Sequence, residues 1–150
     1  MPRTTGYAGI MSDTFDISKF NFSGLGHGKA IGLRYNAYGS DWAELAIDYD
    51  PRLVMDTNTN VLATGAIISL IDSACGLAIM VRNGGLRPTA TLDLRVDYMR
   101  AAHVGHSVIA RGTCYRLTRS VAFLRCEAHD GDPDDLVAHA SGTFMFTGAV

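Results

Sequence analysis

The sequence predicts an α+β domain in which one long helix packs on a curved antiparallel sheet of about six strands. Two observations predict it. Residues 61–81 are apolar almost throughout and contain no proline, as expected for a helix in the middle of a fold. The segments on both sides of this stretch show instead the two-residue alternation that is typical of strands.

The helix has recognisable start and stop signals. It follows the polar run 56–60, which is rich in residues that cap helices. It should end near Arg82, where a basic residue is followed by asparagine and two glycines. Such a stretch is also long enough to cross a bilayer. Asp72 at its midpoint would cost roughly 2.5–3.5 kcal/mol there, and later strands can cover it, so a buried helix is expected instead of a membrane span.

Strand periodicity places two strands before the helix and four after it. The predicted strands are 30–38, 42–49, 89–99, 106–117, 121–129 and 136–147. Tight turns are expected at 39–41 and 118–120. In strand 89–99 the apolar residues Ala90, Leu92, Leu94, Val96 and Tyr98 alternate with the polar residues Thr91, Asp93, Arg95 and Asp97. The polar set should therefore face away from the helix, toward solvent or a second subunit.

The N-terminal residues look less regular. Residues 1–28 are expected to form a lead-in that can include a short helix capped by Ser12, and residues 29–150 a single domain. His27 lies in a run of spaced glycines at 24, 26 and 28. A dinucleotide-binding loop would need a preceding strand and a following helix. A strand follows here, so this run is interpreted as a loop.

Composition excludes several classes of function. The chain has 13 basic and 15 acidic residues without a run of either sign, which argues against a nucleic-acid partner. The first residues lack the apolar core of a signal peptide. The three cysteines match no zinc or redox spacing and are expected in the core. We expect a cytoplasmic protein that has no membrane partner and no cofactor.

Two sequence features superficially suggest metal binding. His103 and His106 have the spacing of paired ligands, but no third ligand is evident, so a surface loop is expected. The acidic segment 130–135 has Asp135 at the position of the sixth-residue glycine of a calcium-binding loop, has Ser141 at the position of its twelfth-residue glutamate, and lies between two predicted strands. Both features are therefore interpreted as loops, and no metal site is predicted.

Asp72 is the residue that needs explanation, because an aspartate in mid-helix is costly to bury without a partner. One interpretation is a structural aspartate satisfied by serine, threonine or an arginine of a partner. The other is a general base or nucleophile in an apolar slot. Gly65 lies about two turns earlier on the same helix face, so the unpaired N–H groups of the helix start and this carboxylate share that face.

Two blocks of the sequence resemble hotdog-fold thioesterases, in particular the PaaI-like branch of phenylacetate-degradation thioesterases. They are residues 67–76, which carry Asp72, and residues 91–101. The order of predicted elements agrees from about residue 29 onward. The resemblance implies a hotdog fold, hydrolysis of an acyl-CoA thioester, and a homodimer or a homotetrameric dimer of dimers with active sites between subunits.

The resemblance also implies roles for individual residues. Asp72 would activate water or attack the thioester, while the backbone N–H groups of Thr64 and Gly65 would polarise the carbonyl oxygen. Thr91 would lie near the attacking group and reach the site of the other subunit. Asn58 lies close to the position of an asparagine that is common in the family. The expected substrate contacts are Ala63, Ile68 and, for a CoA phosphate, Arg119.

This chain departs from the family pattern at the helix start. Members usually have His-Gly-Gly where this sequence has Ala63, Thr64 and Gly65, and Ala101 replaces a common proline. A non-catalytic protein that binds acyl thioesters is therefore the main alternative to a thioesterase. A dehydratase or hydratase generally pairs a carboxylate with a histidine, and the predicted helix contains no histidine.

Overall fold

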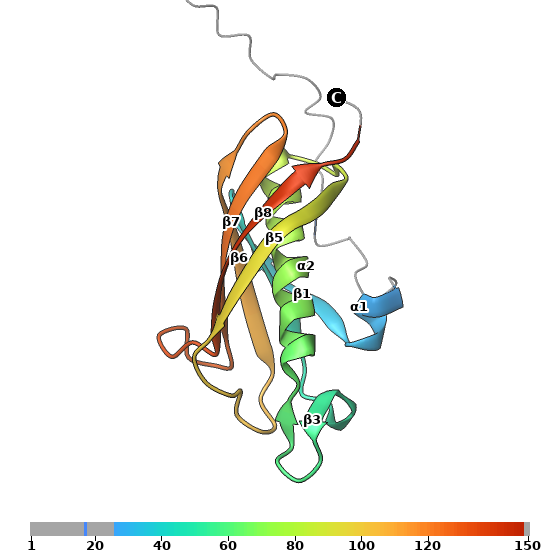
Figure 1. Cartoon of the computed structure of the whole chain (residues 1–150), viewed down its shortest axis with the longest axis vertical. Coiled ribbons are helices and arrows are strands. Elements are labelled where there is room, and N and C mark those ends of the chain that lie inside the picture. The colour runs from blue at the N-terminus through green and yellow to red at the C-terminus, as the bar shows by residue number, and fades with distance from the viewer. Residues whose placement is uncertain (1–16, 18–25, 149–150) are drawn as a thin grey trace, which may run out of the picture.

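A curved six-stranded antiparallel sheet holds one long helix against its inner face in the computed structural model, which describes residue 17 and residues 26–148 (Figure 1). The elements are α1 (Gly26–Ala30), β1 (Leu33–Tyr38), β2 (Trp42–Ile47), the 3-10 helix η3 (Pro51–Leu53), β3 (Val54–Asp56), β4 (Val61–Leu62), α2 (Thr64–Asn83), β5 (Thr89–Tyr98), β6 (Val108–Leu117), β7 (Val121–His129) and β8 (Ala138–Phe146). The strand order is β1-β2-β6-β7-β8-β5. The predicted fold class is confirmed, and every predicted strand is present with its ends shifted by at most three residues.

The start of the long helix differs from the prediction. Residues 61 and 62 form β4, which pairs with β3, and α2 begins only at Thr64. The polar run 56–60 is the turn of this small hairpin and not a helix cap: the carbonyl of Asp56 accepts hydrogen bonds from the N–H groups of Thr59 and Asn60. The predicted glycine stop is confirmed. Gly84 has a φ of 72°, and its N–H reaches the carbonyls of Met80 and Val81.

One face of α2 packs closely on the sheet. Gly112 of β6 makes this possible, because a Cβ there would lie 2.7 Å from the carbonyl oxygen of Ala74. The buried residues of the helix include Leu70, Ile71 and Ala78. They belong to a core that also contains all three cysteines, as predicted.

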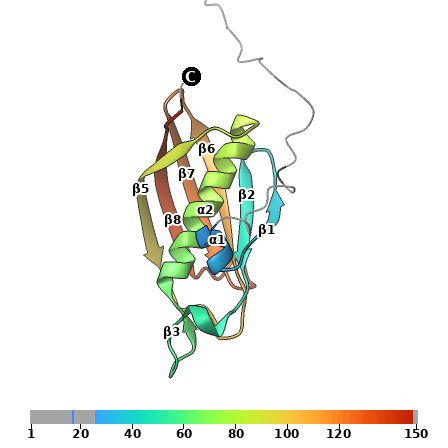
Figure 2. The same cartoon turned by 90° about the vertical axis from the view of Figure 1, so that its right-hand side faces the viewer.

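The opposite face of α2 is open in the single chain, although the sequence of the helix is apolar almost throughout. Figure 2 shows this face in front of the sheet, with α1 beside it. Ile68 on this face is 41% exposed. By length and composition alone α2 could also span a membrane, but half of its most apolar stretch of residues is buried inside the fold. The open face carries the polar residues of the helix.

Strand β5 does not keep the regular alternation that its sequence predicts. Its pairing with β8 shifts between Thr91 and Asp93, so a bulge at Leu92 reverses the faces of the residues that follow. Thr91 pairs with the buried Phe144 and faces the helix, contrary to expectation, while Leu92 is 55% exposed. Beyond the bulge, Tyr98 also faces the helix and bonds to the carbonyl of Thr64.

The glycine run near the N-terminus also differs from expectation. Residues 26–30 form the short helix α1 and not a loop, and Gly32, with a φ of 69°, separates it from β1. The strand predicted from residue 30 therefore begins at Leu33. The short helix predicted after Ser12 lies in residues that the structure does not describe, apart from Ile17, which is buried in the core.

Candidate active site

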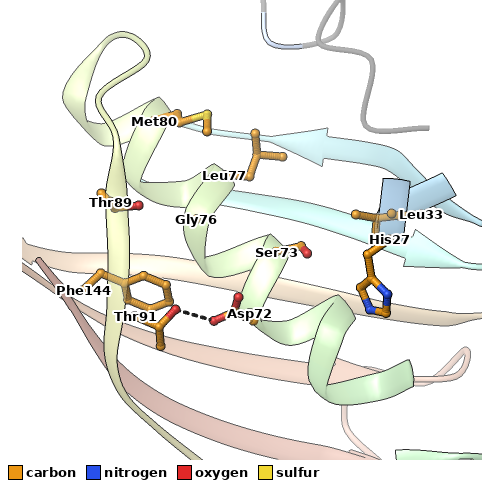
Figure 3. A pocket seen from close by; sticks show the side chains of 11 residues that line it. His27, Leu33, Asp72, Ser73, Gly76, Leu77, Met80, Thr89, Thr91 and Phe144 are labelled. Atoms are coloured by element: carbon orange, nitrogen blue, oxygen red, sulfur yellow. Dashed lines mark hydrogen bonds between the residues drawn. The ribbon is translucent and has the colours of Figure 1, made fainter. Parts of the chain in front are cut away.

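Asp72 lies half-buried on the open face of α2, opposite β5. The Thr91 hydroxyl donates a hydrogen bond of 2.8 Å to its Oδ1 (Figure 3). No other hydrogen bond reaches the Asp72 carboxylate from the described part of the chain. Thr91 therefore orients the carboxylate and leaves Oδ2 available as an acceptor.

A cavity of about 350 Å³ opens beside this carboxylate. Its residues come from α1, β1, α2, β5 and β8, and its lining combines apolar side chains with a few polar ones. The large apolar side chains in the lining are Leu33, Leu77, Met80 and Phe144. In Figure 3, His27 lies beside Leu33 on one side of α2, and Thr91 lies beside Phe144 on the other side. Ligand pockets usually combine an apolar lining with a few polar groups in this way.

The start of α2 offers unpaired backbone donors. Ala63 is the cap residue and provides no side-chain hydrogen bond. Thr64 and Gly65 are exposed, and their N–H groups have no acceptor among the residues that the structure describes. A second cavity of about 250 Å³ lies here, lined by residues that include Met55, Thr64 and Tyr98. Burial raises the pKa of Tyr98, partly offset by its hydrogen bond to Thr64. Helix starts of this kind bind and stabilise negative charge.

The two groups that the sequence joins in one mechanism are not close together in one chain. Thr64 and Asp72 are eight residues apart on α2, which is about 12 Å along the helix axis. A single carbonyl group cannot contact the donors at the helix start and also lie within reach of Asp72. The donors at the helix start and the Asp72 carboxylate are therefore two separate features of the same open face.

Comparison with known proteins gives the same family as the resemblance found in the sequence. The family model of the thioesterase superfamily matches residues 59–137, which include α2 and the strands β5, β6 and β7. The medium/long-chain acyl-CoA thioesterase YigI of Salmonella typhimurium is 31% identical over 130 residues, covering 78% of this chain and 83% of that protein. The chain belongs to the thioesterase superfamily.

Solved structures agree with this membership. A Pseudomonas aeruginosa protein that is 32% identical superposes with a TM-score of 0.77, covering 85% of this chain and 95% of that chain. A mutant form of the phenylacetic acid degradation protein PaaI from Thermus thermophilus is 28% identical, with a TM-score of 0.68 and coverage of 79% and 96%. The predicted PaaI-like hotdog family and the thioester-hydrolase class are thus confirmed.

Three other residues that were expected to serve the site do not line the cavity beside Asp72. Asn58 is at the exposed turn between β3 and β4, where its amide donates to Asp56. Ile68 is exposed on the open face of α2 and does not line either cavity. Arg119 is exposed in the turn between β6 and β7, and its carbonyl accepts a hydrogen bond from Arg87. Thr91, expected to serve a second subunit, contacts Asp72 of its own chain.

His27 is a residue of this cavity that the sequence interpretation missed. Its Nε2 lies 2.9 Å from the hydroxyl of Ser69, which is 42 residues away in the chain. The only sequence signal was a histidine among spaced glycines in a region expected to be a loop. The packing of α1 on α2 places His27 at the cavity, and a periodic sequence pattern cannot predict a contact between two such distant segments.

His103 and His106 have a third titratable neighbour, which the sequence did not reveal. A carboxylate oxygen of Asp130 and one ring nitrogen each of His103 and His106 all lie within 4.8 Å of one another. The Asp130 oxygens accept two hydrogen bonds from Arg100 and others from the N–H and ring of His103. The Arg100 guanidinium holds the pKa of Asp130 well below its usual range, although burial acts in the opposite direction. This cluster joins two loops of the superfamily fold.

Proposed function

We propose that this protein hydrolyses acyl-CoA thioesters of medium or long acyl chains and that Asp72 is the general base. The supporting observation is the Asp72 carboxylate, held by Thr91 at one oxygen beside a largely apolar cavity of about 350 Å³. The YigI relatives are named for acyl-CoA substrates of these lengths. The apolar lining of the cavity suits an acyl chain.

In the proposed reaction, Asp72 removes a proton from water while the water oxygen bonds to the thioester carbonyl carbon. The negative charge that develops on the carbonyl oxygen is stabilised by the N–H groups of Thr64 and Gly65, which have no other acceptor in the described chain. The C–S bond then breaks, the CoA thiolate leaves, and the proton held by Asp72 moves to the sulfur. The products are the free acid and CoA.

We further infer that each complete site uses two chains. The donors at Thr64 and the base at Asp72 are about 12 Å apart within one chain, which a second, antiparallel α2 can bridge. β5 forms one edge of the sheet and pairs only with β8 among the described strands, so a second β5 can continue the sheet. Ile68 would then lie between the two helices and be protected from water.

The first test is thiol release from a panel of acyl-CoA thioesters by the wild type and by Asp72→Asn. Hydrolysis by the wild type that falls at least a hundredfold in Asp72→Asn supports the proposal. Equal activity in both would remove Asp72 from the mechanism. Tight binding of acyl-CoA without thiol release would favour the non-catalytic binding protein, which the replacement of the family histidine by Ala63 also suggests.

The second test uses Thr64→Pro. Proline is well tolerated at the first helical position, but it removes the backbone donor there. Thr64→Pro should lower kcat about a hundredfold, whereas the control Thr64→Ala keeps the donor and should remain near wild type. A one-to-one mixture of Thr64→Pro and Asp72→Asn chains should recover about a quarter of wild-type activity if sites are shared. No recovery after unfolding and refolding together would show that each chain works alone.

A further inference from the structure

A hydrogen-bond chain fixes the chemical form of His27. The Ser69 hydroxyl donates its single hydrogen to the carbonyl of Gly65 at 3.0 Å. At the same time its oxygen lies 2.9 Å from His27 Nε2. Both contacts are satisfied only if Nε2 carries the proton and donates to Ser69. In the neutral ring, Nδ1 is then an acceptor, and no group in the described chain donates to it.

His27 is exposed and lines one side of the cavity that contains Asp72, beside Leu33 (Figure 3). The apolar residues Met80 and Phe144 line another part of the same cavity. A thioester whose acyl chain lies against Met80 and Phe144 therefore directs its thiol arm toward His27 and solvent. This direction is required for CoA, because its nucleotide is too large for the cavity and must remain outside.

We propose that His27 is a substrate-recognition residue that accepts a hydrogen bond at Nδ1 from the first amide N–H of the pantetheine arm. This inference rests on the proposed function. In an acyl-CoA, that amide nitrogen follows the thioester carbon by four bonds, about 5–6 Å in an extended arm. His27 therefore acts on binding and specificity, while Asp72 acts on the reacting carbon.

The test compares three thioesters of the same medium-chain acid: the CoA ester, the N-acetylcysteamine ester, which keeps the first amide N–H, and the S-ethyl ester, which lacks it. His27→Leu should lower kcat/KM about tenfold for the first two, mainly through a higher KM, and leave the S-ethyl ester within twofold. His27→Gln keeps a donor and an acceptor and should restore much of the loss. Ser69→Ala should give a smaller loss on the same two substrates.

Lys29→Leu is the matched control, because Lys29 is an exposed residue of α1 that does not line the cavity. Lys29→Leu should leave kcat/KM unchanged for all three substrates. If His27→Leu lowers kcat/KM equally for the S-ethyl ester, or lowers it for no ester, the recognition role is overturned, even if Asp72→Asn confirms the hydrolase. A fall in kcat alone would also overturn it.

Binding gives a readout that does not depend on hydrolysis. A non-hydrolysable 2-oxoalkyl thioether of CoA should bind His27→Leu about tenfold more weakly than the wild type by calorimetry. This loss is expected even if the protein proves to be a binding protein, so the two proposals fail separately. Nitrogen NMR of labelled histidine should show His27 as the Nε2–H tautomer, and an Nδ1–H tautomer would contradict the inference.

Discussion

Asp72 and Asp130 show how differently one fold can use a carboxylate. Asp130 is 6% exposed and accepts hydrogen bonds from Arg100 and from the N–H and ring of His103. Asp72 is half-buried, accepts one hydrogen bond from Thr91, and borders a cavity. A carboxylate whose acceptors are all used can only hold structure together. One with an oxygen to spare beside an apolar cavity can also take a proton from bound water.

The largest expected effect separates the two aspartates by activity. Asp72→Asn should lower kcat about a thousandfold and change the melting temperature little, because the side chain lies half-exposed and keeps its shape. Thiol release and thermal unfolding measure the two quantities. A strongly destabilised Asp72→Asn would assign Asp72 the same structural role as Asp130.

Asp130→Asn should have the opposite result. Removing the charge leaves the poorly exposed Arg100 guanidinium without its main partner, which should lower the free energy of unfolding by about 3 kcal/mol at pH 7. Activity per folded molecule should fall far less than in Asp72→Asn, because Asp130 lines neither cavity and only its partner Arg100 borders the second one. Denaturant unfolding tests this, and unchanged stability would contradict the role of the cluster.

The stability gained from Asp130 should depend on pH in a defined direction. Its pKa is lower in the folded chain than the value of about 3.9 for a free aspartate, chiefly because of Arg100. The ionised form therefore stabilises the fold above that free value, and this contribution disappears as the pH falls toward the folded pKa. The difference in unfolding free energy between wild type and Asp130→Asn should shrink below about pH 4. A difference that stays constant down to pH 2 would exclude this linkage.

A smaller effect is expected at the hydroxyl that orients Asp72. Thr91→Val removes the 2.8 Å hydrogen bond with little change of shape and should lower kcat about tenfold. Thr89 is the matched control, because it lines the same cavity from the same strand and makes no hydrogen bond to Asp72. Equal effects of Thr91→Val and Thr89→Val would mean that the hydrogen bond does not matter for rate.

The smallest effect is expected at Gly76, which lines the cavity one turn after Asp72. A Cβ there meets no atom within 4 Å, so Gly76→Ala should raise the free energy of unfolding by up to about 1 kcal/mol through helix propensity. The added methyl group also narrows the cavity and should shift preference toward shorter acyl chains. An unchanged chain-length profile would place the acyl chain elsewhere.

Local patterns predicted most of the fold. The apolar stretch, the strand alternation and the glycine at position 84 depend on neighbouring residues, and the structure reproduces them within a few positions. The bulge at Leu92 could not be predicted, because the shift is defined only by pairing with β8. For the same reason the side of the sheet to which Thr91 belongs was assigned incorrectly.

The sequence by itself determined the long apolar helix, the isolated carboxylate Asp72 and the family to which the chain belongs, because each is encoded within one continuous segment. Only the tertiary structure decided which groups meet that carboxylate. Thr91 reaches it through a strand irregularity, and His27 enters the same cavity through the packing of α1 on Ser69. These contacts join residues far apart in the chain, where the register of strands and the docking of helices set distances that no local pattern carries.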